Sequence, residues 1–105
     1  MSADPDLRIS VRPTEGGTRI ELDGELDVAT APELQRRADE VVGASGDVWL
    51  DCSALSFADS SGLATVTRLA QALRARQRRL VLTQLRPAVR RAMDVLQITE
   101  LFELE

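Results

Sequence analysis

The first part of the chain alternates between apolar and polar residues with a period of two. The apolar positions of the first run are Leu7, Ile9 and Val11, and the alternation resumes at Ile20 and Leu22. A period of two is typical of a half-buried β-strand. Glu15-Gly16-Gly17 lies between the two runs, and glycine adopts the positive φ of a tight turn without steric cost. The pattern therefore predicts an antiparallel β-hairpin.

Apolar residues then recur at helical spacing after the segment Thr30-Ala31-Pro32-Glu33. This segment predicts a capping box, in which the Thr30 hydroxyl accepts a hydrogen bond from the Glu33 amide and the Glu33 carboxylate reaches back to the Thr30 amide. Pro32 suits the first helical turn, where its missing N–H is no loss. The apolar stripe of this helix is Leu34, Ala38, Val41 and Val42, and Gly43 and Gly46 end it.

Two further strand–helix pairs follow. Val48-Trp49-Leu50 and Leu80-Val81-Leu82 are short apolar runs that predict buried strands. A helix is expected from near Ser60 and another from Pro87. Their apolar faces are Leu63, Val66, Ala70 and Leu73 in the first, and Val89, Ala92, Met93 and Leu96 in the second. A last short strand is expected from Leu101, Phe102 and Leu104.

This order of elements predicts one α/β domain over residues 1–105, with residues 1–6 as a flexible N-terminus. Strands that are joined through a helix run parallel by right-handed crossovers, whereas a hairpin pairs antiparallel strands. The expected fold is a mixed β-sheet, in which the N-terminal antiparallel hairpin is followed by βαβαβ crossovers and packed by helices.

Composition narrows the possible chemistry. Hydrophobic residues make up 44% of the chain and charged residues 29%, as in a globular domain, while the aromatic share of 3% predicts an aliphatic core. The sequence contains no histidine and no lysine. A Ser-His-Asp triad, a histidine-ligated metal, a Schiff-base lysine and a Walker A lysine are therefore excluded. We expect no enzyme, no catalytic residue, no metal and no cofactor.

Charge and cysteine content bear on partners and location. The net charge is −4 and all 13 basic residues are arginine, so the basic surplus of a nucleic-acid-binding protein is missing. The cluster Arg74, Arg76, Arg78 and Arg79 is interpreted as a solvated helix end, with cations near the negative end of the helix dipole. A single cysteine, an acidic N-terminus unlike a signal peptide, and no apolar run of about 20 residues favour a cytoplasmic protein without membrane contact.

The segment Asp59-Ser60-Ser61-Gly62-Leu63 lies between a predicted strand and a predicted helix. In one interpretation it is only a helix cap, for which Asp and Ser are preferred. In the other, Ser60 accepts a phosphate, which would meet free backbone amides and the positive end of the dipole. A partner that buries the neutral hydroxyl would then have to bury a dianion, and a penalty of about 3–4 kcal/mol weakens binding more than a hundredfold.

Three separated motifs stand out along the chain. The first is Gly24-Glu25-Leu26-Asp27, continuing into Thr30-Ala31-Pro32-Glu33-Leu34. The second is Leu55-Ser56-Phe57-Ala58-Asp59-Ser60-Ser61-Gly62-Leu63. The third is Leu85-Arg86-Pro87-Ala88-Val89-Arg90-Arg91, leading to Ile98. In this order and spacing the three motifs are specific and cover nearly the whole chain. Together they resemble the STAS-domain anti-sigma factor antagonists of bacteria.

The resemblance implies a phosphoswitch. Ser60 would be the phosphoacceptor, with Ser61 as a minor alternative. The unphosphorylated protein would bind an anti-sigma factor with a GHKL-type serine kinase fold and so release a sigma factor, and a PP2C-like phosphatase would restore this form. The expected partner-binding surface consists of Asp27, Thr30, Asp59, Ser60, Ser61 and Gly62. Asp27 has an equally good interpretation as a turn residue after the second strand.

Other functions stay open at this point. A soluble STAS subunit of a lipid-transport ABC complex uses a similar fold, but such subunits often lack the full Asp-Ser-Ser-Gly pattern. A scaffold subunit of a stress-signalling assembly usually carries additional N-terminal domains. An enzyme is the weakest alternative, because nothing places a general base at Ser60. Arg36, Arg37 and Arg68 are explained equally well as a partner-facing rim or as solvated helix faces.

Overall fold

Strands and helices alternate along the chain after an initial hairpin. The computed structural model of the protein describes residues 6–105. Its strands are β1 (Leu7–Thr14), β2 (Gly17–Leu26), β3 (Asp47–Ala58), β4 (Leu80–Thr83) and β5 (Glu103–Leu104). Its helices are α1 (Ala31–Val42), α2 (Ser60–Arg74), α3 (Pro87–Val95) and the short 3-10 helix η1 (Thr99–Leu101).

The strands form one mixed sheet whose order follows the chain, β1-β2-β3-β4-β5. β1 and β2 are antiparallel, and every later neighbouring pair is parallel. This confirms the predicted α/β fold, the hairpin and the crossovers. The hairpin turn contains Gly16 at a φ of +87°, a conformation that favours glycine. Because β2, β3 and β4 are parallel, the loops that lead from them into α1, α2 and α3 all leave the same edge of the sheet.

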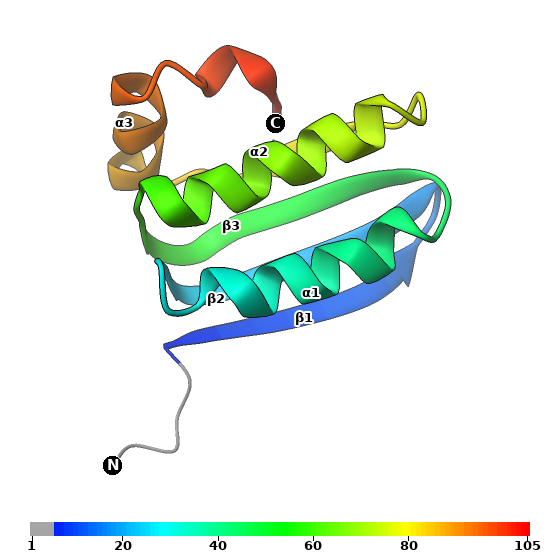
Figure 1. Cartoon of the computed structure of the whole chain (residues 1–105), viewed down its shortest axis with the longest axis horizontal. Coiled ribbons are helices and arrows are strands. Elements are labelled where there is room, and N and C mark those ends of the chain that lie inside the picture. The colour runs from blue at the N-terminus through cyan, green and yellow to red at the C-terminus, as the bar shows by residue number, and fades with distance from the viewer. Residues whose placement is uncertain (1–5) are drawn as a thin grey trace.

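Helices α1 and α2 lie side by side on one face of the sheet, and α3 lies beyond the N-terminal end of α2 (Figure 1). The core between them is aliphatic, as predicted. Its largest fully buried side chains are Ile20, Leu22, Leu26, Leu34, Leu50, Leu55, Leu73, Leu82 and Met93. The packing of this core fixes the two helix N-termini at the edge where the loops gather.

The predicted third strand was too short. Only Val48-Trp49-Leu50 was expected, but β3 runs through Asp47–Ala58 and ends directly before the Asp59 motif. Irregular pairing with β2, between Glu21 and Asp23 and again between Gly24 and Glu25, shifts the register along β3. Exposed serines therefore interrupt the apolar pattern on which the prediction depended.

The C-terminal segment also departs from its prediction. β5 contains only Glu103 and Leu104, which pair with β4. Leu101 belongs to η1, and Phe102 is the buried residue of this segment. Leu96 was placed on the apolar face of α3, but it follows the end of that helix and is 42% exposed.

The arginine cluster at the end of α2 is not simply solvated. The Arg78 guanidinium donates hydrogen bonds to the carbonyl oxygens of Val41, Val42 and Gly46 at 3.1, 2.8 and 2.6 Å. Arg79 binds the carboxylates of Asp47 and Glu103. Arg78 thus binds carbonyl oxygens at the C-terminus of α1. The interpretation of this residue as part of a solvated end of the preceding helix is wrong.

Two expectations concern features at the limits of the described chain. The flexible N-terminus predicted for residues 1–6 lies outside the described residues except for Asp6, whose carbonyl accepts a hydrogen bond from the Glu25 amide. Within residues 6–105, no helix is both long enough and apolar enough to cross a membrane.

Candidate functional site

The junction between β3 and α2 is capped by Asp59. Its Oδ1 accepts a hydrogen bond from the Gly62 amide at 2.9 Å, and its backbone is extended, as in an N-cap. Ser60 is the first residue of α2. The helix-cap interpretation is therefore confirmed for Asp59. It does not compete with a role for Ser60, because the capping side chain and the serine hydroxyl are separate groups.

Gly62 allows the first turn of α2 to lie directly on the end of β2. A Cβ atom at this position would lie 2.5 Å from Leu26 Cγ and 2.7 Å from the Leu26 carbonyl oxygen, closer than real Cβ contacts. The Asp59 amide also donates to the Leu26 carbonyl oxygen at 3.1 Å. These contacts hold the start of α2 against the strand end that precedes Asp27.

The loop between β2 and α1 is ordered by Asp27 and Thr30. The Asp27 Oδ1 accepts hydrogen bonds from the amides of Ala29 and Thr30 at 2.9 and 3.0 Å. The Thr30 hydroxyl accepts from the Asp27 amide and donates to the Glu25 carbonyl oxygen, both at 2.9 Å. Asp27 is thus a turn residue, as one of its two interpretations expected.

The predicted capping box at Thr30 is wrong. α1 begins at Ala31 with Pro32 in its first turn, as expected, but the Thr30 side chain makes no cap hydrogen bond. The Glu33 carboxylate instead pairs with Arg36 at 2.6 Å, and the hydrogen bond from Arg36 is the main reason that the pKa of Glu33 lies below its usual value. The Thr30 hydroxyl is instead bonded to the Asp27 amide and the Glu25 carbonyl oxygen, and Asp27 binds the Thr30 amide that Glu33 was expected to reach.

The six residues expected at the partner-binding surface come from the loop before α1 and from the junction between β3 and α2. Ser60 and Ser61 are exposed, whereas Gly62 is buried against Leu26. As the first residues of α2, the two serines have backbone amides without a helical acceptor. The exposed hydroxyls therefore stand at the positive end of the helix dipole.

Two grooves run beside the first turns of α2. The α1 groove, of about 420 Å³, is lined by Val28, Ala31, Pro32, Gln35, Ser61, Ala64, Thr65 and Arg68. The α3 groove, of about 380 Å³, is lined by Ser60, Leu63, Ala64, Thr67, Arg68, Leu96 and Ile98. Each groove thus contains one of the two motif serines.

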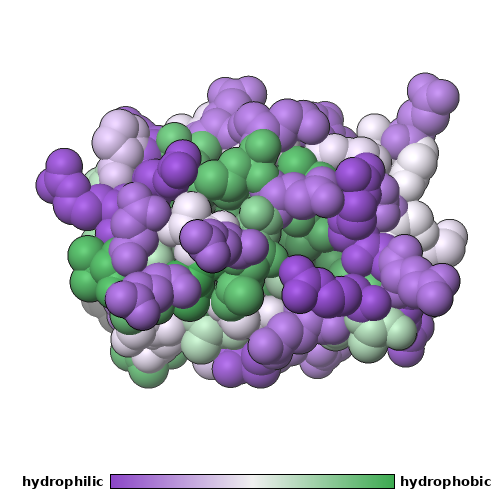
Figure 2. Space-filling model, turned by 90° about the horizontal axis from the view of Figure 1, so that it is seen from above, coloured by the Kyte–Doolittle hydropathy of each residue, from purple (hydrophilic) through white to green (hydrophobic). Residues whose placement is uncertain are grey.

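Exposed hydrophobic side chains accompany the motif. Val28 is 71% exposed in the Asp27 loop, Phe57 is 48% exposed at the end of β3, and Leu96 lies in the α3 groove. Figure 2 views the side of the molecule on which α3 and η1 lie, and it shows hydrophobic atoms at the surface among hydrophilic side chains. None of these three residues was predicted as a site residue. Phe57 lies within the second motif and Val28 directly follows Asp27 of the first, which was the available signal.

The chain has no histidine and no lysine to act as a base toward Ser60. Among residues 6–105, no three His, Cys, Asp or Glu side chains come together as they would to hold a metal ion. What the site presents is an exposed hydroxyl at a helix N-terminus, with apolar grooves on both sides.

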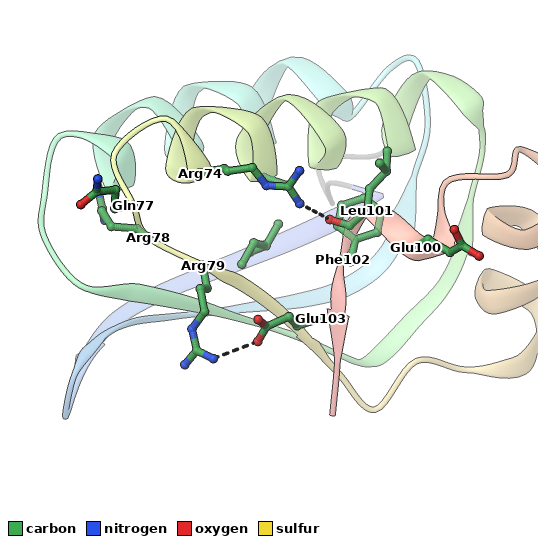
Figure 3. Close-up of a pocket in the computed structure, with 10 residues that line it drawn as sticks. Arg74, Gln77, Arg78, Arg79, Glu100, Leu101, Phe102 and Glu103 are labelled. Atoms are coloured by element: carbon green, nitrogen blue, oxygen red, sulfur yellow. Dashed lines mark hydrogen bonds and ion pairs between the residues drawn. The ribbon is translucent and has the colours of Figure 1, made fainter.

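A third hollow, of about 310 Å³, lies at the opposite end of α2 (Figure 3). Except for Glu100, its charged side chains are engaged in structural contacts. Arg74 donates to the Leu101 carbonyl oxygen at 3.4 Å, and Arg79 pairs with Glu103 at 3.1 Å (Figure 3). These contacts fasten the C-terminal segment to α2 and β4, so we assign no ligand to this hollow.

Comparisons with known proteins agree with this geometry. The sequence model of the STAS domain matches residues 8–105. A similar solved structure, an anti-sigma factor antagonist from Mycobacterium paratuberculosis, is 27% identical, covers 98% of this chain and 89% of that chain, and has a TM-score of 0.81. No curated protein sequence matches the chain.

A second similar protein is the anti-sigma factor antagonist SpoIIAA. Its unphosphorylated form is 25% identical, with 94% of this chain and 86% of that chain covered and a TM-score of 0.73. The phosphorylated form of SpoIIAA, a cell fate determinant of Bacillus, is 23% identical, with 93% and 91% of the two chains covered and the same TM-score of 0.73.

Proposed function

Because this chain belongs to the STAS-domain family, we propose that it is an anti-sigma factor antagonist whose partner binding is switched off by phosphorylation of Ser60. The observation that carries the proposal is the position of Ser60. Its hydroxyl is exposed at the first residue of α2 and lines a groove with apolar residues from α2 and the segment after α3. Two similar structures are named as antagonists, and SpoIIAA takes both an unphosphorylated and a phosphorylated form.

The switch follows from the charge that the phosphate adds. In the unphosphorylated protein the partner covers Ser60 and the adjoining grooves. A phosphate on Ser60 adds about two negative charges at pH 7. The amides of the first turn and the dipole of α2 stabilise this group within the free protein, so the fold is retained. The partner would have to desolvate the dianion, and this penalty weakens the complex.

The partner of the unphosphorylated form is an anti-sigma factor with a GHKL-type serine kinase fold, which phosphorylates Ser60 with ATP. A PP2C-like phosphatase removes the phosphate. The protein is not itself an enzyme and works in the cytoplasm. Asp27, Thr30, Asp59 and Ser61 complete the contact surface, with Ser61 as a minor phosphorylation site. Gly62, also expected at this surface, lies beneath it against Leu26.

The test is an affinity capture from a lysate of the source organism, with partners identified by mass spectrometry. The baits are wild type, Ser60→Ala, Ser60→Asp and the matched control Ser10→Asp, which adds the same charge at an exposed serine of β1. We expect wild type, Ser60→Ala and Ser10→Asp to capture a kinase-fold ATPase, and Ser60→Asp to lose it.

A different result would reject the proposal. If all four baits capture the ATPase and permease subunits of a transporter, the protein is the soluble STAS subunit of a lipid-transport complex. Ser60 would then be only the first residue of a helix. If Ser60→Asp captures the kinase-fold ATPase as well as wild type does, the charge at Ser60 does not control binding.

A further inference from the structure

Among residues 6–105, Arg68 is the one residue with a charged side chain that lines both grooves beside the motif serines. In the α1 groove it lies with Ser61 and Thr65, and in the α3 groove with Ser60 and Leu96. It follows Ser61 by seven positions on α2, which places both residues on the same face of the helix. Arg68 therefore stands where the two apolar grooves meet.

The Arg68 guanidinium is held in place by neutral groups. Its Nε donates to Gln35 Oε1 at 3.2 Å, and its Nη2 donates to the Thr65 hydroxyl at 3.1 Å. Gln35 is itself oriented, because its Nε2 donates to the Asp39 carboxylate at 2.8 Å. Thr65 is only 1% exposed. The side chain is thus positioned before any partner arrives, which reduces the entropy lost on binding.

Arg68 has hydrogen-bonding capacity left over. A guanidinium has five N–H donors, and two of them are used here. Within residues 6–105, no carboxylate lies within ion-pair distance of Arg68. The acidic residues of the site are engaged elsewhere: Asp27 and Asp59 bind backbone amides. The remaining donors on Nη1 and Nη2 suit a carboxylate that is bound through both oxygens.

We infer that Arg68 selects the anti-sigma partner by binding a carboxylate of its docking segment. This inference rests on the proposed function and specifies the partner's chemistry. The segment carries an aspartate or glutamate with apolar side chains beside it. The acidic group meets Arg68, and the apolar side chains enter the α1 groove and the α3 groove. An anti-sigma factor with a neutral or basic residue at this position would leave Arg68 desolvated and unpaired, and would be rejected.

The position of Arg68 also links the choice of partner to the phosphorylation of Ser60. Ser60 and Arg68 line the same groove. A phosphate on Ser60 places negative charge in the groove into which the partner brings its carboxylate. Repulsion between these two anions then adds to the desolvation penalty. A partner chosen for its acidic group is therefore the kind of partner that phosphorylation expels most effectively.

The test uses the kinase-fold anti-sigma factors encoded in the source genome, each purified and titrated against this protein. The variants are Arg68→Glu and Arg68→Lys, with Arg74→Glu as the matched control. Arg74 lies on the same helix and carries the same charge, but it faces the C-terminal segment. We expect Arg68→Glu to weaken binding by about 10- to 100-fold and Arg74→Glu by less than about twofold. The affinity of Arg68→Lys should fall between those of the two glutamate variants, because a lysine ammonium cannot bind both oxygens of a carboxylate in the way that a guanidinium does.

A compensating change identifies the carboxylate directly. Acidic residues of the partner's protected segment, located by hydrogen exchange of the complex, are changed one at a time to arginine. We expect one of these changes to weaken binding to wild type and to restore binding to Arg68→Glu. Circular dichroism of each variant confirms that the fold is intact, which is expected because Arg68 is exposed.

The outcomes separate this inference from the proposed function. If Ser60→Asp abolishes binding while Arg68→Glu binds as tightly as wild type, the role of Arg68 is wrong and the phosphoswitch stands. If Arg68→Glu and Arg74→Glu weaken binding equally, only long-range charge is involved and the specific role is rejected. If no kinase-fold anti-sigma factor binds wild type or Ser60→Ala, the proposed function is wrong and the inference fails with it.

Discussion

At Gly62, the absence of a Cβ atom allows the first turn of α2 to lie close to the end of β2. Alanine is a better helix former than glycine by about 1 kcal/mol, so the substitution would be favourable in an unconstrained helix. At this position the end of β2 occupies the space that a methyl group needs, because Leu26 lies against the glycine. Close contact between the strand end and the helix therefore outweighs helix propensity.

We expect Gly62→Ala to lower the free energy of unfolding by about 1–3 kcal/mol, because the clash forces the first turn of α2 away from Leu26. Urea denaturation followed by circular dichroism measures this change. Gly43→Ala is the control, since a Cβ there would lie 3.4 Å from the Glu40 carbonyl oxygen and the backbone φ is −71°. Similar losses in both variants would show that the Leu26 contact is not the cause.

A second effect at the residue scale concerns Asp51, whose side chain is 12% exposed. Burial by itself would raise the pKa of this carboxyl, but hydrogen bonds from Ser53 and Arg19 outweigh it, so the pKa lies below its usual value. The Arg19 Nη2 lies 2.7 Å from Asp51 Oδ2. A lowered pKa in the folded state means that the ionised carboxylate stabilises the fold above the unfolded pKa, and that this stabilisation is lost as the pH falls through the folded pKa.

We therefore expect Asp51→Asn to be less stable than wild type at pH 7, by about 1–3 kcal/mol, the usual contribution of hydrogen bonds to a charged group. The gap should close as the pH falls below about 4, the usual pKa of an aspartate in an unfolded chain. Thermal melts of both proteins from pH 7 to pH 2.5 test this. A gap that stays constant over the whole range would contradict the ionic origin of the effect.

At the scale of elements, Arg78 joins the end of α2 to the end of α1. It donates hydrogen bonds to the carbonyl oxygens of Val41 and Val42 in the last turn of α1 and of Gly46 in the loop that follows. The last turn of α1 contains no basic residue of its own. A cation from another element thus takes the place that a lysine or arginine in the last turn often occupies.

Replacing Arg78 by methionine keeps most of the aliphatic stem and removes the three hydrogen bonds. We expect Arg78→Met to lower the free energy of unfolding by about 2–4 kcal/mol, since several charge-assisted bonds are lost together. Arg91→Met, at an exposed arginine of α3, should change it by less than about 0.5 kcal/mol. Chemical denaturation provides both values. Equal losses would show that the hydrogen bonds of Arg78 are not the cause.

Sequence patterns predicted elements well where the signal is local. The hairpin, the starts of α1 and α2 and the buried strand β4 depend on nearby residues, and all were found. Elements that depend on distant contacts were predicted poorly. The full length of β3 follows from its irregular pairing with β2, and the Thr30 hydroxyl turns away from α1 because of Asp27 and Glu25. The local pattern shows neither the irregular strand pairing nor the hydrogen-bond partners of the Thr30 hydroxyl.

The same division holds for the site. The motif residues Ser60 and Asp27 could be identified from the sequence, because the family resemblance rests on them. The grooves could not, because the residues that line them from the α1 region and from the segment after α3 are brought beside α2 only by the tertiary packing. The pattern even placed Leu96 in the core. Exposure of an apolar residue at the end of a helix depends on how the chain continues, which periodicity does not report.

At the scale of the whole molecule, Cys52 reports on the integrity of the fold. It lies in the core and is 2% exposed. Burial, together with the negative charge of Asp51, raises the pKa of its thiol to about 12. The reactive thiolate is therefore both scarce and shielded in the folded protein.

We expect iodoacetamide to leave Cys52 unmodified at pH 8 in the native protein and to modify it at once in urea. In the native state, modification should proceed only through opening of the core, so its rate measures the stability of the whole domain. Mass spectrometry of samples taken over time gives this rate. Rapid labelling without denaturant would show that β3 opens locally, contrary to its position in the middle of the sheet.

The order of the strands bears on how the molecule is made. In this sheet each strand pairs with the strand that precedes it in the chain. During synthesis, which proceeds from the N-terminus, every strand thus finds its neighbour already present and never has to insert between two others. The contacts of Leu26 with Asp59 and Gly62 join only segments that precede β4 in the chain. The serine that would receive the phosphate is therefore positioned by the segments that are synthesised first.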